Sequence, residues 1–280
     1  MKDNLTVAFQ GERGAFSEIA AEKFFNKKII TSPVYSFEEV FGNVNKELSD
    51  YGIIPVENTL YRSVFENYDL LLKYKVYVVG ELNLQIHHCL ISQEKYSLKE
   101  IKKVYSHYQA LGQCSRFLES LENIEVVPTY DTAGSVLIVK QNNDEPSAAI
   151  ASSYAAKIYK MKILAKNIQN KKINYTRFFI ISRKKFEPPL INPKSTLSFD
   201  LKSVPGALHK ALGVFANAGI NLSMIESRPI PEKPFQYTFY VDISGDVEDE
   251  NIKQALKELS NLTITIKKIG TYETGKTYQS

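Results

Sequence analysis

The stretch INYTRFFIIS, residues 173–182, combines a core strand with a permanent charge. Residues 178–181 are all apolar, which is typical of a strand buried in a sheet. Thr176 and Arg177 come directly before this run, and an arginine stays charged at every working pH. Arg177 either extends along an apolar stem to solvent or waits for an anion such as a carboxylate. The residues alone leave both interpretations open.

Short apolar runs alternate with helical patterns on the N-terminal side of that stretch. A strand is expected over 5–11 and a helix over 16–25. A second helix begins at Ser36, because Glu39 three residues later completes a capping-box signature. The alternation predicts an α/β fold with a mainly parallel sheet. Further strands are expected over 51–58, 102–107, 124–130 and 147–152, and further helices over 109–121, 132–141 and 153–160.

Polar residues follow the predicted strands of this region, and all but one group lead promptly into a helix. Ligands of open α/β sheets bind outside the carboxyl ends of the strands, and helix N-termini suit anions. Any single group is more simply explained as a helix N-cap. Five groups on one side of the fold nevertheless predict a polar pocket for an anionic ligand. These groups are Gln10–Gly11, Glu57–Asn58–Thr59, Ser106–His107, Asp131–Thr132 and Ser152–Ser153.

A proline-marked segment, SRKKFEPPLINPKS at 182–195, separates this region from a smaller one. Proline lacks an N–H and restricts the residue before it, so we expect a linker at 183–194. The region after the linker predicts the order βαββαβ, which is the ferredoxin-like arrangement. Gly219 is placed to end the first helix of that region. Because clusters of reactive side chains are absent from its sequence, we expect a binding or assembly module.

The composition is that of a soluble globular protein, with 44% hydrophobic and 24% charged residues in a chain of 280. A net charge of +4 gives no strong case for nucleic acid or a membrane as partner. Two cysteines, Cys89 and Cys114, do not make a disulfide framework. No secretory or membrane-spanning apolar segment is recognisable. We therefore expect a cytoplasmic protein.

Two motifs suggest special chemistry at first sight. IHHCLIS sets His87, His88 and Cys89 side by side, but neighbours in a strand face opposite sides. Since no further Cys/His cluster supplies partners, no metal is expected. GERGAFSE carries Gly11 and Gly14 between a strand and a helix, but it lacks the third glycine and the acidic residue of a dinucleotide fingerprint. A tight turn beside a small ligand and a purely structural turn are equal alternatives.

Several segments together resemble the prephenate dehydratase family, in that family's order. YTRFFIIS resembles its Thr-Arg-Phe motif, and IPVENTLYRSVFENYDLL resembles its Pro-(Ile/Val)-Glu-Asn-Ser…Gly-Ser-Val element. SHYQALGQC, YDTAGSV and AAIASSYAAKIYKMKILAKNIQ match the segments between them. The region after the linker resembles an ACT domain, with GALH and IESRP where that family binds phenylalanine. Arg62, Tyr108 and Thr59 depart from the pattern, where the family has Gly, Pro and Ser.

The resemblance implies an α/β catalytic domain over 1–182, with two periplasmic-binding-protein-like lobes around a cleft. One lobe would span about 1–80 plus 165–182 and the other about 81–164, followed by the linker at 183–194 and the ACT domain at 195–275. The implied reaction is the decarboxylative dehydration of prephenate to phenylpyruvate in phenylalanine biosynthesis. It needs no cofactor, because aromatisation of the ring supplies the driving force. Arogenate as substrate and a non-catalytic amino-acid sensor on the same fold are the alternatives.

The resemblance also implies roles for individual residues. Thr176 would donate a hydrogen bond or a proton to the leaving hydroxyl, and Arg177 would hold a carboxylate or orient Thr176. The implied catalytic residues are Thr176, Arg177 and Glu57, and the substrate-binding residues are Asn58, Thr59, Ser63, His107, Gln109, Thr132 and Phe178. Phenylalanine would inhibit allosterically from a subunit interface of a homodimer or homotetramer. Its implied site is Gly206, Ala207, Leu208, His209, Asn221, Glu226, Ser227 and Arg228.

Overall fold

The chain forms two compact units in the computed structural model. This model describes residues 5–26, 28–60, 62–142, 145–185, 189–230, 233 and 235–280, with only the backbone of Arg62. The larger unit consists of Met1–Tyr74, Leu82–Ile180 and Lys276–Ser280, and the smaller one of Lys75–Glu81 and Ile181–Gly275. Two strands, β5 (Tyr77–Gln85) and β11 (Tyr175–Ser182), run from one unit into the other.

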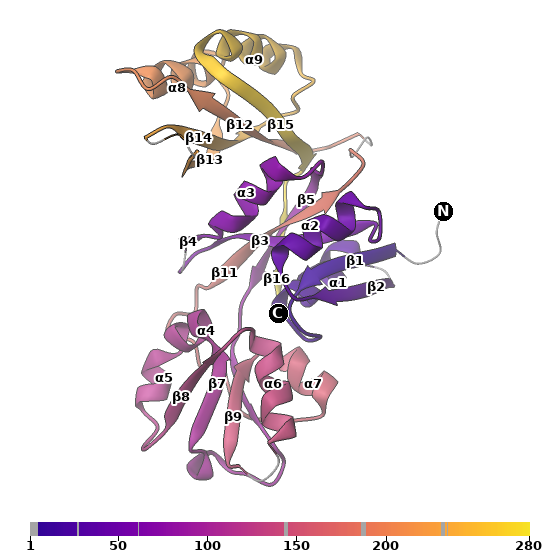
Figure 1. The fold of residues 1–280 in the computed structure, drawn as a ribbon, viewed down its shortest axis with the longest axis vertical. Coiled ribbons are helices and arrows are strands. Elements are labelled where there is room, and N and C mark those ends of the chain that lie inside the picture. The colour runs from indigo at the N-terminus through magenta and orange to yellow at the C-terminus, as the bar shows by residue number, and fades with distance from the viewer. Residues whose placement is uncertain are drawn as a thin grey trace. The chain divides into compact units, whose positions relative to one another are not determined.

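The first sheet has the strand order β16-β5-β11-β3-β1-β2, with β4 paired to β3 (Figure 1). The apolar run of β11 is fully buried in this sheet, as predicted. The Ser36 hydroxyl caps α2 by accepting the Glu39 N–H at 3.2 Å, whereas the Glu39 carboxylate accepts from the Tyr35 N–H at 3.1 Å. The other elements are β1 (Leu5–Gln10), α1 (Phe16–Phe25), β2 (Ile29–Val34), α2 (Phe37–Asn45), β3 (Tyr51–Asn58), β4 (Arg62–Ser63), α3 (Phe65–Lys73) and β16 (Lys276–Gln279).

The second sheet has the order β10-β6-β9-β7-β8, and α4 to α7 flank it (Figure 1). β7 pairs in parallel with β8 and β9, whereas β6 pairs antiparallel with β9 and β10. β10, β9, β7 and β8 therefore all run in one direction and β6 runs against them, so this sheet is mixed but mainly parallel, as predicted. The elements are β6 (Cys89–Ser92), η1 (Leu98–Glu100), β7 (Lys103–His107), α4 (Tyr108–Gln113), α5 (Ser115–Glu119), β8 (Glu125–Thr129), α6 (Thr132–Gln141), β9 (Ser147–Ala151), α7 (Ser153–Tyr159) and β10 (Lys162–Lys166).

The helix expected over 109–121 is broken at Cys114 into α4 and α5. Asn170, which lies beyond β10, supplies hydrogen bonds at the break. Its backbone N–H donates to the Gln113 carbonyl at 2.6 Å and its amide to the Gly112 carbonyl at 3.1 Å. Its side-chain oxygen accepts the Arg116 N–H at 3.0 Å. A residue distant in sequence therefore stabilises the break, which the local apolar pattern does not reveal.

The chain passes from one sheet to the other at positions that differ from the lobe limits that we predicted. β5 stays in the first sheet as far as Gln85, beyond the limit at 80. β10 pairs with β6 in the second sheet, although its last residues were expected in the first lobe. β16 corresponds to no predicted element and pairs in parallel with β5. The domain limits at 182 and 195 stay predictions, and Pro188 in the expected linker lies outside the described residues.

The smaller unit confirms the predicted order βαββαβ, with a sheet of order β13-β14-β12-β15. α8 and α9 pack on one face of this sheet around Leu197, Phe199 and Phe215 (Figure 1). Gly219, at φ 67°, ends α8 as predicted, because the Ile220 N–H donates to the Phe215 carbonyl at 2.9 Å. The elements are β12 (Pro193–Leu201), α8 (Ala207–Asn217), β13 (Leu222–Pro229), β14 (Tyr237–Ser244), α9 (Glu250–Leu262) and β15 (Thr263–Glu273).

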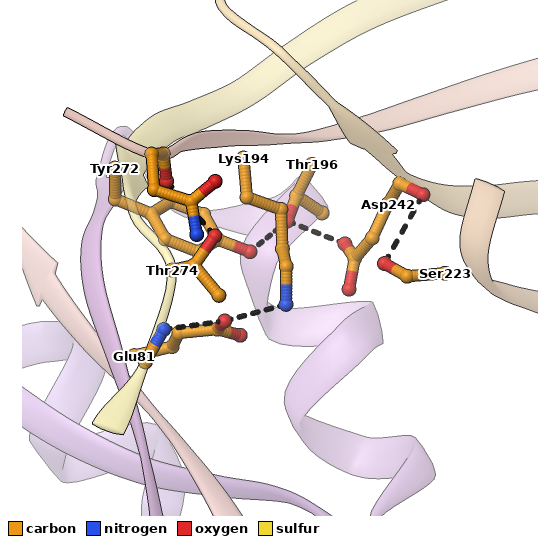
Figure 2. A network of polar contacts seen from close by, with 9 residues as sticks. Glu81, Lys194, Thr196, Ser223, Asp242, Tyr272 and Thr274 are labelled. Carbon is orange, nitrogen blue, oxygen red and sulfur yellow. Dashed lines mark hydrogen bonds and ion pairs between the residues drawn. The ribbon is translucent and has the colours of Figure 1, made fainter. Parts of the chain in front are cut away.

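Buried polar contacts attach the first residues of β5 to the sheet of the smaller unit (Figure 2). The Lys194 ammonium lies 2.5 Å from the Glu81 carboxylate, whose side chain is 2% exposed. The same carboxylate oxygen accepts the Gly275 N–H at 2.9 Å. Beside this pair, the Thr196 hydroxyl donates to Asp242 at 2.6 Å. The ion pair thus joins β5 to β12, and the Gly275 bond adds the segment that follows β15.

Replacement of Lys194 by Met should lower the free energy of unfolding by about 3–5 kcal/mol, because it removes one partner of a buried ion pair. Denaturant unfolding of the purified chain measures this change. Lys268→Met is the matched control, since its partner Glu248 is 67% exposed and surface pairs contribute about 1 kcal/mol or less. Equal losses in the two variants would contradict a special role for the Glu81–Lys194 pair.

Candidate functional site

A cavity of about 580 Å³ lies in the larger unit, and its wall comes from both sheets. Gln10 and Asn58 reach it from the ends of β1 and β3. Asp131 reaches it from the turn that follows β8. The polar strand ends therefore meet in one cavity, with the exception of Ser152–Ser153. Seven predicted site residues line the wall, namely Asn58, Ser63, His107, Gln109, Thr132, Thr176 and Phe178.

No lysine or arginine is among the described side chains that line this cavity. Helix N-termini supply positive potential instead, since α1, α2 and α6 present the first-turn residues Phe16, Phe37 and Thr132 to it. Free backbone N–H groups and the positive end of the helix dipole favour a bound anion. These N-termini therefore favour a bound carboxylate. The side chain of Arg62, which departs from the family pattern, lies outside the described structure.

The hydroxyl of Thr176 is oriented by the side chain of Asn58. The Asn58 amide Nδ2 donates to Thr176 Oγ1 at 2.9 Å and to Asn174 Oδ1 at 3.0 Å. The Asn58 oxygen in turn accepts the Leu60 N–H at 2.8 Å, which fixes the orientation of the amide group. Because the Thr176 oxygen accepts this bond, its own proton is left to donate elsewhere. Thr176 can therefore present a hydrogen-bond donor to a ligand in the cavity.

A chain of buried hydrogen bonds continues from Asn58 into the second sheet. Asn174 donates to Gln113 Oε1 at 2.7 Å, and the ring nitrogen His88 Nε2 lies 2.7 Å from the same oxygen. Since this oxygen accepts, Nε2 carries the ring proton of His88. His88 Nδ1 has no hydrogen-bond partner among the described residues. The chain links Thr176 in the first sheet to the start of β6 in the second.

Burial keeps both imidazoles of the cavity wall neutral. Desolvation lowers the pKa of His88 to about 4, although the Gln113 hydrogen bond opposes this shift. Desolvation likewise lowers the pKa of His107 below its usual value. At neutral pH neither ring carries a charge, so neither is set up as a strong proton donor. Burial also raises the pKa of Asp131, against the effect of N–H bonds from Glu12 and Ala133.

Three predicted residues do not line the cavity. Arg177 follows Thr176 in β11, so its side chain leaves the opposite face of the strand, where the guanidinium lies over the Phe179 ring at 4.7 Å. Glu57 precedes Asn58 in β3 and is exposed. Thr59 accepts the Tyr175 N–H at 3.0 Å and thereby ties the end of β3 to β11. These residues surround the Thr176 strand without facing the ligand space.

No sequence pattern singled out Gln113, Asn174 or His88 as a site residue. Gln113 lies inside the segment SHYQALGQC that carried the family resemblance, so that segment held a signal for it. Asn174 and His88 are buried, and both contact Gln113 only because the tertiary structure brings the segments before β11 and β6 together. No residue spacing within one element predicts such a convergence.

The smaller unit has a hollow of about 350 Å³ beside the start of α8. Ala207 and Leu208 line it, together with residues 201–205, 235–237 and Phe239. Gly206 has a φ of 78°, and a Cβ added there would meet nothing within 4 Å. The glycine is therefore required by its backbone conformation rather than by a close neighbour among the described residues.

The other predicted phenylalanine contacts do not line this hollow, although Ser227 pairs with its lining residue Phe239 in the sheet. Glu226, Ser227 and Arg228 belong to β13, and Asn221 precedes that strand. His209 is exposed on the first turn of α8 and does not line the hollow. Of the predicted phenylalanine-binding residues, Ala207 and Leu208 thus line the hollow of one chain, and three others belong to β13.

Neutral groups dominate the chemistry that the cavity offers. The donors among the described residues of its wall are amides, hydroxyls, imidazoles and backbone N–H groups. The described residues contain no group of three His, Cys, Asp or Glu side chains arranged to hold a metal ion.

Among the same residues, no helix is long and apolar enough to span a membrane.

A two-lobed α/β cleft with an oriented hydroxyl, followed by a small βαββαβ module, defines an enzyme with a separate binding domain. Residues 7–186 match the family model described as prephenate dehydratase, and residues 195–261 match the ACT domain. The chain therefore belongs to the prephenate dehydratase family, whose members are carbon–oxygen lyases, and an ACT domain follows its catalytic region.

Relatives of known sequence support this membership over nearly the whole chain. A bifunctional chorismate mutase/prephenate dehydratase of Aquifex aeolicus is 38% identical over 97% of this chain and 74% of its own length. Arogenate dehydratase/prephenate dehydratase 2 of Arabidopsis thaliana is 39% identical over 95% of this chain and 72% of its own.

Two solved structures have the same fold along the chain. GqqA, described as a novel type of quorum quenching acylase, aligns with a TM-score of 0.88 at 30% identity over 96% of this chain and 98% of its own. Prephenate dehydratase of Arthrobacter aurescens in complex with L-Phe aligns with a TM-score of 0.88 at 27% identity over 96% of this chain and 90% of its own.

Replacement of Asn58 by Asp should lower kcat at least about a hundredfold, while KM changes less. A carboxylate at this position accepts the Thr176 proton instead of donating to its oxygen, so the hydroxyl turns away from the cavity. Steady-state turnover of prephenate measures the effect, with circular dichroism to establish folding. Thr59→Ser is the control, because it keeps the hydroxyl that accepts from Tyr175. A normal kcat for the Asn58→Asp enzyme would rule out this orienting role.

Proposed function

We propose that the cavity of the larger unit converts prephenate into phenylpyruvate, carbon dioxide and water. The observation that carries this proposal is the Thr176 hydroxyl, whose oxygen accepts from Asn58 so that its proton is available to a leaving group. A substrate with two carboxylates suits a cavity surrounded by the N-termini of α1, α2 and α6.

The proposed reaction is a decarboxylative elimination. The bond between the ring and its carboxylate breaks, and its electron pair moves through the ring to complete the aromatic system. The ring hydroxyl leaves from the opposite carbon as hydroxide, which becomes water on protonation. Thr176 donates a hydrogen bond to this oxygen as negative charge develops on it, and a preorganised donor of this kind contributes roughly 3–4 kcal/mol. Aromatisation supplies the driving force, so we propose that no cofactor takes part.

Substrate carboxylates are proposed to bind through backbone N–H groups and neutral side chains. Thr132 at the start of α6 and Gln109 in α4 lie on the wall where such contacts are available, and Ser63 lies on β4. Arg177 takes the alternative role of a support for Thr176 from the opposite face of β11, since its guanidinium stacks on Phe179. Glu57 is proposed to brace the end of β3 rather than to carry a proton, because its side chain is exposed.

Replacement of Thr176 by Ala should lower kcat for prephenate by two to three orders of magnitude, as expected for roughly 3–4 kcal/mol. Release of carbon dioxide and formation of phenylpyruvate by the purified chain measure it. Thr176→Ser keeps the hydroxyl and should stay within about tenfold of the native enzyme. Near-native turnover by a folded Thr176→Ala enzyme would refute the assigned role.

Arogenate is a second candidate substrate, because the Arabidopsis thaliana relative carries both activities in its description. It differs from prephenate by an amino group in place of the keto group, and the same elimination applies. Comparison of kcat/KM for the two compounds decides between them. An absence of carbon dioxide release from both would instead support the amino-acid sensor.

The ACT domain is proposed to bind phenylalanine and to inhibit the reaction from a distance. The Arthrobacter aurescens structure contains L-Phe, and its chain aligns with this one throughout. The start of α8 offers Gly206, Ala207 and Leu208 to the ligand carboxylate. Asn221, His209 and the β13 residues Glu226, Ser227 and Arg228 are proposed to complete the site, with β13 supplied by a second subunit. A homodimer or homotetramer is therefore proposed, in a cytoplasmic location that suits two buried free cysteines.

Phenylalanine should bind the purified chain in calorimetry and lower its turnover of prephenate. Gly206→Ala should weaken binding about tenfold, because a φ of 78° is strained for any residue with a Cβ. Gly213→Ala, in the same helix and with nothing within 4 Å of its Cβ, should bind normally. An absence of binding, or binding without inhibition, would contradict the regulatory proposal.

A further inference from the structure

The GERGAF segment after β1 contributes a loop, residues 11–14, whose function is not explained by the reaction. Glycines at both ends of this loop have positive φ, 107° for Gly11 and 93° for Gly14. Inside its own lobe the loop is held by Glu18, which is 0% exposed and accepts the Gly14 N–H at 2.6 Å. Other polar groups of the loop bond to the helices of the second sheet.

Asp131 joins this loop to the N-terminus of α6 with a single carboxylate. Its Oδ1 accepts the Ala133 N–H at 2.6 Å and caps the helix. Its Oδ2 accepts the Glu12 N–H, also at 2.6 Å, from the first lobe. Asp131 is 6% exposed, and a Cβ at Gly11 would lie 3.1 Å from Oδ2. The carboxylate is thus enclosed between the two lobes.

Ser152 makes the corresponding connection at the N-terminus of α7. Its hydroxyl accepts the Ala155 N–H at 3.0 Å as an N-cap and donates to the Gly14 carbonyl at 2.7 Å. A Cβ at Gly14 would lie 2.7 Å from the Cα of Ala155. The absence of a side chain at Gly14 therefore permits backbone-to-helix contact between the lobes. Ser152 is 1% exposed and lines no part of the cavity.

Two tyrosines add further contacts between the same surfaces. The Tyr130 hydroxyl donates to the Glu12 carboxylate at 3.1 Å, and the Tyr154 hydroxyl donates to Glu22 at 2.8 Å. The Tyr130 ring also stacks on Tyr35 with ring centroids 5.9 Å apart. Because Tyr130 and Tyr35 both line the cavity, these contacts lie along its margin.

We propose that the loop of residues 11–14 with Asp131 and Ser152 is an inter-lobe latch, which holds the cavity in the closed form that binds substrate. Asp131 and Ser152 are positioning residues in this arrangement. They keep the N-terminus of α6, which presents Thr132, at a fixed place relative to Thr176 of the first lobe. The chain passes between the lobes after β5 and after β10, and these two crossings form the hinge. The latch connects the lobes where the chain does not pass between them.

The latch acts through the population of the closed form. When only a fraction of the enzyme is closed, the apparent dissociation constant rises by the inverse of that fraction. Loss of one carboxylate or hydroxyl bond between the lobes changes the equilibrium constant between the closed and open forms about tenfold. The closed fraction falls by nearly the same factor where the open form predominates. At saturating substrate the lobes close again. The latch therefore affects KM for the substrate much more than kcat.

Three variants test the latch. Asp131→Ser retains a hydroxyl that can cap α6 but is too short to reach Glu12 as well, and Ser152→Ala removes the bond to Gly14. Both should raise KM for prephenate about five- to twentyfold with kcat within about threefold. Ser152→Thr keeps the hydroxyl and should restore the native KM. Ser97→Ala, which removes an exposed N-cap of η1 outside the latch, should leave KM unchanged.

Hydrogen exchange supplies a readout that does not depend on turnover. The Glu12 amide should be protected in the native chain and should exchange at least about tenfold faster in Asp131→Ser, while the amides of β1 stay unchanged. Fast exchange of this amide in the native chain would overturn the latch. An unchanged KM in a folded Ser152→Ala enzyme would overturn it as well, since a purely structural cap lowers only the melting temperature.

The KM measurements rest on the proposed function, because they need turnover of prephenate. The latch and the proposed function can nevertheless be refuted separately. A native chain without turnover of prephenate would refute the proposed substrate, and the exchange measurement would still decide the latch. A native chain that is active, with Asp131→Ser and Ser152→Ala variants of normal KM and normal Glu12 protection, would refute the latch alone.

Discussion

One hydrogen bond, from the Asn58 amide to the Thr176 oxygen, determines what the cavity can do. A hydroxyl is both donor and acceptor, and it becomes a directed donor only when another group occupies its oxygen. Asn58 is in turn fixed by Leu60 and Asn174, and Asn174 by Gln113. These amides therefore restrict the orientation of the Thr176 hydroxyl, which we propose as the donor to the leaving oxygen of the substrate. A network in which each amide is fixed by its neighbours in this way is rigid, which is what preorganised catalysis requires.

The same network explains how two lobes form one site. Asn58 and Thr176 belong to the first sheet, whereas Gln113 belongs to the first helix beside the second sheet and His88 directly precedes its strand β6. Neutral His88 is essential to this join, because burial holds its pKa at about 4 and keeps one ring nitrogen as a donor without adding charge. Elsewhere between the lobes, Asp131 and Ser152 bond the loop of residues 11–14. Hydrogen bonds thus connect the two lobes at both places.

Much of the architecture was predictable, because it follows from local patterns. The buried strand at 178–181, the cap at Ser36, the order βαββαβ and the turn at Gly219 are properties of a few consecutive residues. Local patterns did not reveal the break at Cys114, the strand β16 or the reversed direction of β6 in the second sheet. Each depends on a partner distant in the chain, such as Asn170 for the break and β5 for β16. The sequence next to a residue does not predict which distant residue it will contact.

Thr176 and Arg177 show what the sequence determines and what only the tertiary structure decides. The sequence by itself determined that they lie at the start of a buried strand, and strand geometry then sends adjacent side chains to opposite faces. Sequence did not determine which face borders the ligand, since that depends on how β11 packs between β5 and β3 and on what the second sheet brings near. Tertiary structure assigned the cavity to Thr176 and the stack on Phe179 to Arg177. The physical reason is that alternation is a local property of the backbone, whereas a cavity exists only between segments that meet in space.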